Sequence, residues 1–194
     1  VMGTDIFAVN TKDGKILWKV NYAAINAATG RVMKNHAITP IYRDGYIMIA
    51  NGYNWVALKL KLSADGNSAE VVWENRNFDP QLGGVVLLGD NVYGNNHMSK
   101  PVDTWVCVDW NTGKTLWTSK WYGKGSVISA DDMLYLYEER SGHVALVKPD
   151  SEKLNIVSEF QIAKGEGPFW AHPVIGNGKL YIRHGDILMV YLIK

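Results

Sequence analysis

Apolar and polar residues alternate over short segments along most of this chain, and tight turns separate the segments. Such alternation predicts antiparallel strands with one buried and one exposed face. A turn that opens an alternating strand recurs at a spacing of about 45 residues. The copies are Asp44–Met48, Gly89–Tyr93, Asp131–Tyr135 and Asn177–Tyr181. One segment, Tyr22–Thr29, has a short helical pattern, and we expect it to form a loop between repeats.

A twelve-residue stretch also recurs without a gap, because Phe7–Trp18 overlays Val106–Trp117. Each copy runs from an apolar strand through a polar turn containing Gly to a second strand that carries Trp. Both repeats together give a unit of four strands, which we name A to D in chain order. Four-stranded units repeated every 40–50 residues or so are typical of β-propellers. The sequence therefore predicts an all-β chain, a β-propeller of four-stranded antiparallel blades present as a partial array of about four blades.

The repeats divide residues 1–194, taken as one propeller segment, into successive parts. The chain opens and closes on a strand C, so we expect the C-terminal part of a longer propeller. Closure as a four-bladed ring, with Ile16–Val20 as the missing outer strand, is the alternative. The predicted parts are the end of one blade (1–30), blades at about 31–80, 81–122 and 123–165, and a terminal partial blade (166–194).

Large aromatic residues share one position of strand D. One sheet cannot bury both of its faces alone, so we expect these side chains to pack between neighbouring blades. The set is Trp18, Trp73, Trp117 and, in a divergent copy, Phe160.

Charge and composition narrow the classes of partner. The formal net charge is +1 with both signs interspersed, which does not suggest a nucleic-acid-binding surface. No apolar run reaches the length of a membrane-spanning helix. Cys107 is the only cysteine, and because it overlays Ala8 we expect a buried, unreactive thiol. Neither Cys-x-x-Cys nor His-x-x-x-His occurs, so we predict no metal site.

Chain reversal at each turn places the B–C and D–A loops on one face of the predicted propeller. These loops are variable and polar, so a binding site is expected there. Trp170 offers a flat ring for stacking, and His172 stands where the other blades carry small residues. Arg183 presents several donors at the start of a loop. The predicted ligand-binding residues are Trp170, His172, Arg183, His97 and Asn96.

The repeat, an apolar-Ala-apolar strand followed by Gly-Lys-x-Leu-Trp, resembles the pyrroloquinoline-quinone-like propeller repeat over essentially the whole chain. Trp170–Ile175 followed by Gly178–Asp186 is similar to the terminal blade of exported bacterial quinoprotein-like proteins labelled polyvinyl-alcohol dehydrogenase. The resemblance implies a periplasmic or otherwise exported protein, although this sequence shows no signal peptide. It also implies pyrroloquinoline quinone with calcium as a possible cofactor. The family's vicinal cysteine pair is missing, and no catalytic or calcium-binding residue can be matched.

Three functions follow as alternatives. The first is a scaffold that binds a protein or glycan partner on the B–C/D–A face, with no identifiable catalytic set. The second is a quinone-dependent alcohol dehydrogenase, which the resemblance implies. The third is a purely structural array of blades.

Overall fold

The computed structural model describes residues 1, 4–27 and 35–193 and is nearly all β. In this part of the chain seventeen strands accompany one short helix. They are β1 (Asp5–Val9), β2 (Ile16–Asn21), α1 (Tyr22–Asn26), β3 (Ile41–Arg43), β4 (Tyr46–Ile49), β5 (Ala57–Leu62), β6 (Ala69–Asn75), β7 (Val86–Leu88), β8 (Asn91–Asn95), β9 (Trp105–Asp109), β10 (Thr115–Ser119), β11 (Gly125–Ala130), β12 (Met133–Glu138), β13 (His143–Lys148), β14 (Asn155–Gln161), β15 (Val174–Gly176), β16 (Lys179–His184) and β17 (Ile187–Leu192).

The strands form five sheets, which we number blades 1 to 5 in chain order. Blades 2, 3 and 4 are β3–β6, β7–β10 and β11–β14, each with four strands in sequential order. Blade 1 contains β1 and β2, and blade 5 contains β15, β16 and β17. Neighbouring strands are antiparallel throughout. The predicted propeller of four-stranded antiparallel blades is confirmed.

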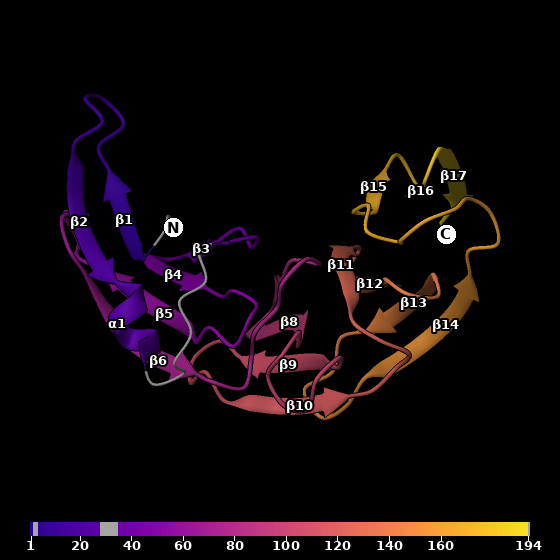
Figure 1. Cartoon of the computed structure of the whole chain (residues 1–194), viewed down its shortest axis with the longest axis horizontal. Coiled ribbons are helices and arrows are strands. Elements are labelled where there is room, and N and C mark those ends of the chain that lie inside the picture. Colours follow the sequence, from indigo (N-terminus) through magenta and orange to yellow (C-terminus); the bar gives the residue numbers. More distant parts are fainter. Residues whose placement is uncertain (2–3, 28–34, 194) are drawn as a thin grey trace.

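The blades follow one another along an open arc, with blade 1 at one end and blade 5 at the other (Figure 1). The predicted alternative of a closed four-bladed ring is wrong, since β17 pairs with β16 and not with β2.

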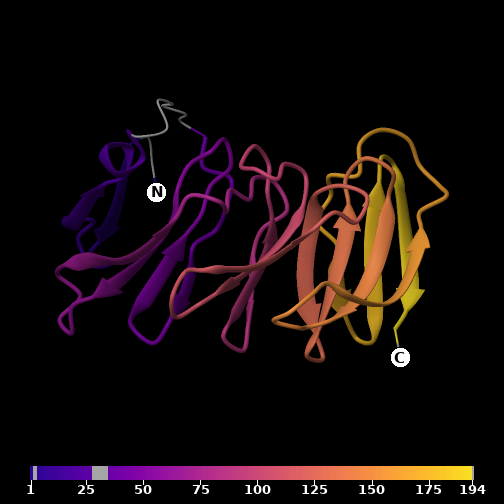
Figure 2. The same ribbon diagram turned by 90° about the horizontal axis from the view of Figure 1, so that it is seen from below.

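Chain direction separates two kinds of connection. The short A–B and C–D turns lie at one end of the sheets, and the B–C and D–A connections lie at the other end. We call this second end the loop face. The connection from β14 to β15 arches over it at the C-terminal side of the molecule (Figure 2).

Helix α1 corrects the prediction of a loop over Tyr22–Thr29. The Asn21 side chain caps the helix by accepting a hydrogen bond of 2.9 Å from the backbone N–H of Ala24. The Tyr22 hydroxyl donates to the carbonyl of Val56 and is fully buried, so burial raises its pKa. Blade 2 therefore stabilises a turn of helix that local propensity alone does not predict. Residues 28 and 29 of that range lie outside the described residues.

A β-bulge in each strand D fixes the register of the tryptophan position. Ala8, Lys59 and Cys107 of strand C face Trp18, Trp73 and Trp117, and the residue preceding each Trp is skipped. In blade 4 the equivalent pair is Leu146 and Ser158. The assignment of Phe160 to this position was therefore wrong by two residues. A bulge twists an outer strand and disfavours pairing with other chains. The skipped residues are Leu17, Val72, Leu116 and Val157.

Each space between neighbouring blades holds its own hydrophobic cluster. Between blades 2 and 3, Trp73 is buried, and its indole N–H donates to the carbonyl of Trp110 at 3.0 Å. A Cβ at Gly113 of blade 3 would lie 2.5 Å from the Trp73 ring, so only glycine fits. Between blades 3 and 4, Trp117 donates to the carbonyl of Asp150 at 2.9 Å. The predicted packing of these tryptophans between blades therefore holds for Trp73 and Trp117.

Cys107 lies in the cluster between blades 3 and 4 and is fully buried. Burial raises the pKa of its thiol to about 12. The thiolate, which is the reactive form, is therefore disfavoured at neutral pH.

Replacing Trp73 should test the contact between blades. Trp73→Ala should lower the free energy of unfolding by about 3–5 kcal/mol, because it removes a buried ring and leaves a cavity. Urea unfolding followed by circular dichroism measures the loss. Trp170→Ala is the matched control, since this ring is 57% exposed, and its effect should stay within about 0.5 kcal/mol. Equal losses for both variants would contradict the assigned packing.

Candidate functional site

One buried polar residue recurs at the end of strand B in four blades. It stands five positions after the residue that opens strand B, and its exposure is 4% or less in every copy. The copies are Asn51, Asn96, Glu138 and His184, which we call the anchor residues. A buried polar side chain is costly unless it is hydrogen-bonded, so its partners show what it does.

The two asparagine anchors hold the D–A loop that precedes their own blade. Asn96 accepts from the backbone N–H of Asp79 at 3.2 Å and donates to the carbonyl of Asn77 at 3.1 Å. Asn51 accepts from Ala37 at 3.3 Å and donates to Asn35 at 2.9 Å, with the same pattern. An amide suits this position because it carries both a donor and an acceptor.

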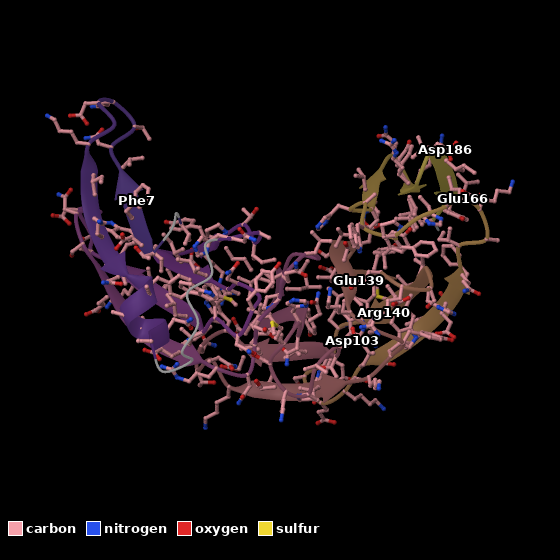
Figure 3. The ribbon with its side chains drawn as sticks, in the orientation of Figure 1. Phe7, Asp103, Glu139, Arg140, Glu166 and Asp186 are labelled. Atoms are coloured by element: carbon pink, nitrogen blue, oxygen red, sulfur yellow. The ribbon has the colours of Figure 1, made fainter. Side chains whose placement is uncertain are left out.

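His184 holds the longer D–A loop that leads into blade 5. Its Nδ1 and Nε2 atoms lie 2.8 and 2.7 Å from the carbonyl oxygens of Lys164 and Gly167. Phe169 stacks on the imidazole with ring centroids 3.8 Å apart. A Cβ at Gly165 would lie 2.3 Å from the His184 carbonyl oxygen, so the loop fits closely around this residue. In Figure 3 Glu166 of this loop lies beside Asp186, at the end of the arc.

Glu138 cannot donate, and it organises its own B–C loop instead. It accepts from the backbone N–H groups of Arg140 and Ser141, each at 2.7 Å, and from the Ser141 hydroxyl at 2.6 Å. Arg140 and its neighbour Glu139 are thereby held at the loop face.

Asp79 joins the loops of two blades. Its buried carboxylate accepts from backbone N–H groups of the blade 3 loop and of Asn54 in blade 2, at 2.9 to 3.0 Å. Hydrogen bonds to a carboxylate are about twice as strong as neutral ones. The three donors in blade 3 are His97, Met98 and Ser99.

These anchored loops surround a pocket of about 490 Å³ on the loop face, formed by blades 3, 4 and 5. Figure 3 places Asp103, Glu139 and Arg140 together near the middle of the arc. The lining residues are Gln81, Leu82, His97, Val102, Asp103, Lys124, Glu139, Arg140 and Trp170.

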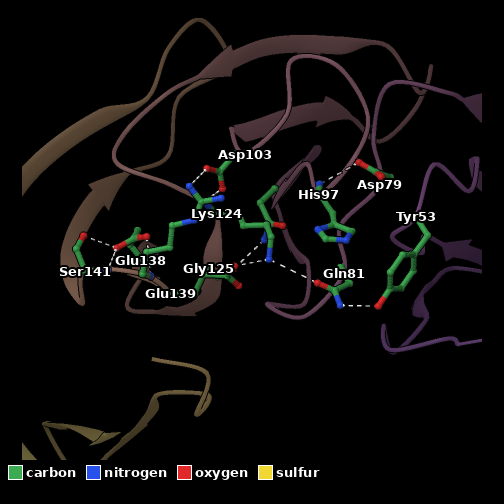
Figure 4. A network of polar contacts seen from close by, with 12 residues as sticks. Tyr53, Asp79, Gln81, His97, Asp103, Lys124, Gly125, Glu138, Glu139 and Ser141 are labelled. Atoms are coloured by element: carbon green, nitrogen blue, oxygen red, sulfur yellow. Dashed lines mark hydrogen bonds and ion pairs between the residues drawn. The ribbon is translucent and has the colours of Figure 1, made fainter. Parts of the chain in front are cut away.

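A chain of polar contacts crosses the pocket from blade 4 to blade 2 (Figure 4). The ammonium of Lys124 lies 2.6 Å from Glu139 and 3.5 Å from the amide oxygen of Gln81. The amide nitrogen of Gln81 then donates to the Tyr53 hydroxyl at 2.9 Å. Since the Lys124 side chain is only 9% exposed, this contact is shielded from solvent. The contacts thereby link loops of blades 4, 3 and 2.

A second ion pair lies at the mouth of the pocket. The guanidinium of Arg140 is 2.8 Å from Asp103, whose other carboxylate oxygen accepts from the backbone N–H of Lys124 at 3.0 Å. The Arg140 side chain is 67% exposed, so solvent screens this pair and its guanidinium is open to a ligand.

His97 lies between Tyr53 and the charged groups. Its ring meets Tyr53 edge to face at 5.0 Å, and its buried Nδ1 has no hydrogen-bond partner among the described residues. Burial lowers the pKa of His97, and the nearby charge of Lys124 lowers it further.

The structure brings two of the predicted ligand residues, Trp170 and His97, into this pocket. Asn96 lies beneath the loops as an anchor and is fully buried. His172 lies outside the lining, with its Cε1 atom 3.4 Å from the position of a Cβ on Gly84. Arg183 also lies outside it and donates to the Gly185 carbonyl at 2.9 Å.

Sequence reasoning did not single out the residues that form the ion pairs, Lys124, Glu139, Arg140 and Asp103. Three of them fall in loops assigned to this face, but each ion pair joins two separate loops, and the Arg140–Asp103 pair joins two blades, so neither pair has a local signal. The anchor residues did have a signal in the sequence, since all four stand at the same distance along the chain from the turn that opens strand B.

The described residues offer no ready ligand set for the calcium that the resemblance implies. Among them, no three His, Cys, Asp or Glu side chains converge as metal ligands. The carboxylates of Asp79, Asp103, Glu138 and Glu139 are each engaged by N–H groups, a hydroxyl or a cation.

Removing the His184 anchor should loosen the loop that carries Trp170. His184→Ala should lower the free energy of unfolding by about 0.5–1.5 kcal/mol, because the carbonyl groups of Lys164 and Gly167 lose their contacts with the imidazole nitrogens. His184→Asn should lose less, since an amide supplies a donor at this position in blades 2 and 3. Urea unfolding and amide exchange of residues 164–170 measure both effects. Unchanged exchange in His184→Ala would contradict the anchor role.

The lowered pKa of His97 should appear as a pH dependence of stability. The unfolded chain titrates near the ordinary value of about 6.5 and binds the proton more readily than the folded one. Folded-state stability is therefore lost as the pH falls below that value and on through the folded pKa. In urea unfolding at pH 7.5 and 5, His97→Gln should show a smaller drop than the unmodified chain. An equal drop would contradict this assignment.

The described residues contain no helix long and apolar enough to span a membrane. No curated protein sequence matches the chain significantly. Among solved structures, BamB from Moraxella catarrhalis is similar over 97% of this chain and 52% of its own, with TM-score 0.66 and 16% identity. The computationally designed protein Ika8 is similar over 99% of this chain and 54% of its own, with TM-score 0.68 and 8% identity.

A quinohemoprotein alcohol dehydrogenase, ADHIIG from Pseudomonas putida HK5, is similar over 75% of this chain and 28% of its own. Its TM-score is 0.52 and its identity 16%, so this likeness, like the other two, shows the fold alone. The chain spans about half the length of the BamB structure it matches. A family model described as outer membrane protein assembly factor BamB matches residues 2–119, more than half of the chain. The protein belongs to this BamB family of pyrroloquinoline-quinone-like propeller repeats.

Proposed function

We propose that this protein is a binding scaffold that holds a protein partner on its loop face. The family is described as an assembly factor for outer membrane proteins, a role that requires contact with other proteins. By the same description, we propose that the protein is exported and works at the outer membrane.

The observation that carries this proposal is how the loop face is built. Buried anchors hold the loops of blades 2 to 5, and Asp79 joins the loops of two blades. A pre-ordered surface loses little conformational entropy on binding, which favours association. The charged groups in the pocket form ion pairs with one another and hydrogen bonds with the loop backbone. Such contacts suit a recognition surface with a fixed shape.

A catalytic role has less support from the same residues. His97 has a lowered pKa, but the described lining of the pocket has no Ser, Thr or Cys and no metal-ligand set beside it, and the amine and carboxylates there are held in ion pairs. No specific observation favours the alcohol dehydrogenase alternative over the scaffold.

Site-specific photocrosslinking tests the proposed surface. A photoreactive residue at Val102, 52% exposed at the pocket, should capture a distinct protein in cells that make this chain. The same residue at Lys153, exposed in the C–D turn of blade 4, is the matched control and should not capture it.

The captured protein is then purified and titrated against the chain. Arg140→Glu should weaken binding by about tenfold or more, whereas Lys153→Glu should change it by less than about twofold. Capture from both positions alike, or equal affinities for both variants, would contradict binding at the loop face.

A further inference from the structure

Trp170 is unlike the other tryptophans of this chain. All eight lie in the described residues, and it is the only one whose side chain is classed as exposed, at 57%. Its loop is nevertheless firmly held, because His184 binds two carbonyls of the loop and Phe169 donates its backbone N–H to the Glu139 carbonyl at 3.3 Å. The fold therefore presents a flat aromatic ring at the edge of the pocket and fixes its position.

The pocket beside this ring carries balanced charge. Its two cations, Lys124 and Arg140, each pair with a carboxylate of the lining, Glu139 and Asp103. His97, the remaining titratable side chain of the lining, favours its neutral form. An anionic ligand would have to compete with these carboxylates and a cationic ligand with the ammonium and guanidinium. The arrangement favours a neutral ligand.

The lining offers donors and acceptors next to one another. The guanidinium of Arg140 donates and the Asp103 carboxylate 2.8 Å away accepts, while Gln81 carries both kinds of group in one amide. A hydroxyl group donates and accepts through the same oxygen, so paired groups of this kind satisfy it fully.

Other neutral ligands fit less well. Every lining residue lies outside the strands, so the pocket offers no strand edge to which an extended peptide could add. Leu82, Val102 and Trp170 are the apolar side chains of the lining, and an apolar molecule would cover its six polar or charged residues without replacing their contacts with water. The volume of about 490 Å³ lies within the range of small-ligand sites.

We propose that this pocket binds a neutral saccharide. One face of a sugar ring stacks on Trp170, and its hydroxyl groups bond to the Arg140–Asp103 pair and to Gln81. Saccharide binding goes beyond the proposed scaffold role, and its test needs no protein partner. A negative result for one proposal therefore does not contradict the other.

The test is binding of saccharides to the purified chain. An array of neutral glycans first selects a ligand, and isothermal titration then measures its affinity in solution. Trigalacturonate and the trimer of glucosamine serve as anionic and cationic probes of similar size. A neutral oligosaccharide should bind, and both charged probes should bind more weakly.

Substitution then assigns the binding to the pocket. Trp170→Ala should lower the affinity for the selected glycan by roughly tenfold, since it removes the stacking surface. Tyr42→Ala is the matched control, because this ring is 67% exposed on β3 outside the pocket, and its affinity should stay within about twofold. Both variants should unfold in urea like the unmodified chain.

Three results would overturn the proposal. One is that no neutral glycan binds in solution with a dissociation constant of about 10 mM or lower, which corresponds to roughly 3 kcal/mol of binding free energy. Another is stronger binding of either charged probe. The third is equal affinity in Trp170→Ala and the unmodified chain.

Discussion

Packing of large side chains between neighbouring blades is the constraint on which the rest of this structure depends. A single blade leaves both sheet faces exposed, and each becomes stable only when its neighbour covers it. Trp73 shows how specific the contact is, since its ring packs on Gly113 and its indole N–H satisfies the Trp110 carbonyl in the next blade. The same carbonyl also accepts from the buried ammonium of Lys59 at 2.9 Å. The buried Trp73 ring and the hydrogen bonds to the Trp110 carbonyl thus hold the two blades in one arrangement.

This arrangement determines the loop face. Because the blades cannot shift, the end of each strand B lies at a constant place relative to the preceding D–A loop. Asn51, Asn96 and His184 use that geometry to hold the loop with side-chain hydrogen bonds, whereas Glu138 holds its own B–C loop. Long loops usually cost conformational entropy and move. Here the anchors supply local order, so that side chains from three blades form one pocket.

The positions of the charged groups in the pocket also depend on these anchored loops. Lys124 and Glu139 can pair in a shielded position because each stands on a fixed loop, and Arg140 reaches Asp103 for the same reason. Pairing offsets the desolvation cost of the buried charges. It also cancels their net charge, so the pair attracts neither anions nor cations strongly. What remains for a ligand is a set of paired charges with hydrogen-bonding groups and one exposed aromatic ring.

The sequence by itself determined the strands, the turns, the blade repeat and the face on which loops gather, because turn chemistry and alternation are local and recur in register. It also pointed to Trp170 and His97, which stand in polar loops and which the structure places in the lining of the pocket. Other features depended on the tertiary structure. Helix α1 forms because Tyr22 is buried against blade 2, and Ser158 rather than Phe160 takes the tryptophan position because β14 pairs with β13 in a register that places Ser158 opposite Leu146. Asn96 proved to be an anchor, and the Arg140–Asp103 ion pair of the pocket joins loops of blades 4 and 3. Contacts of that kind depend on the rotation between blades, which side-chain packing sets and which no local pattern along the chain records.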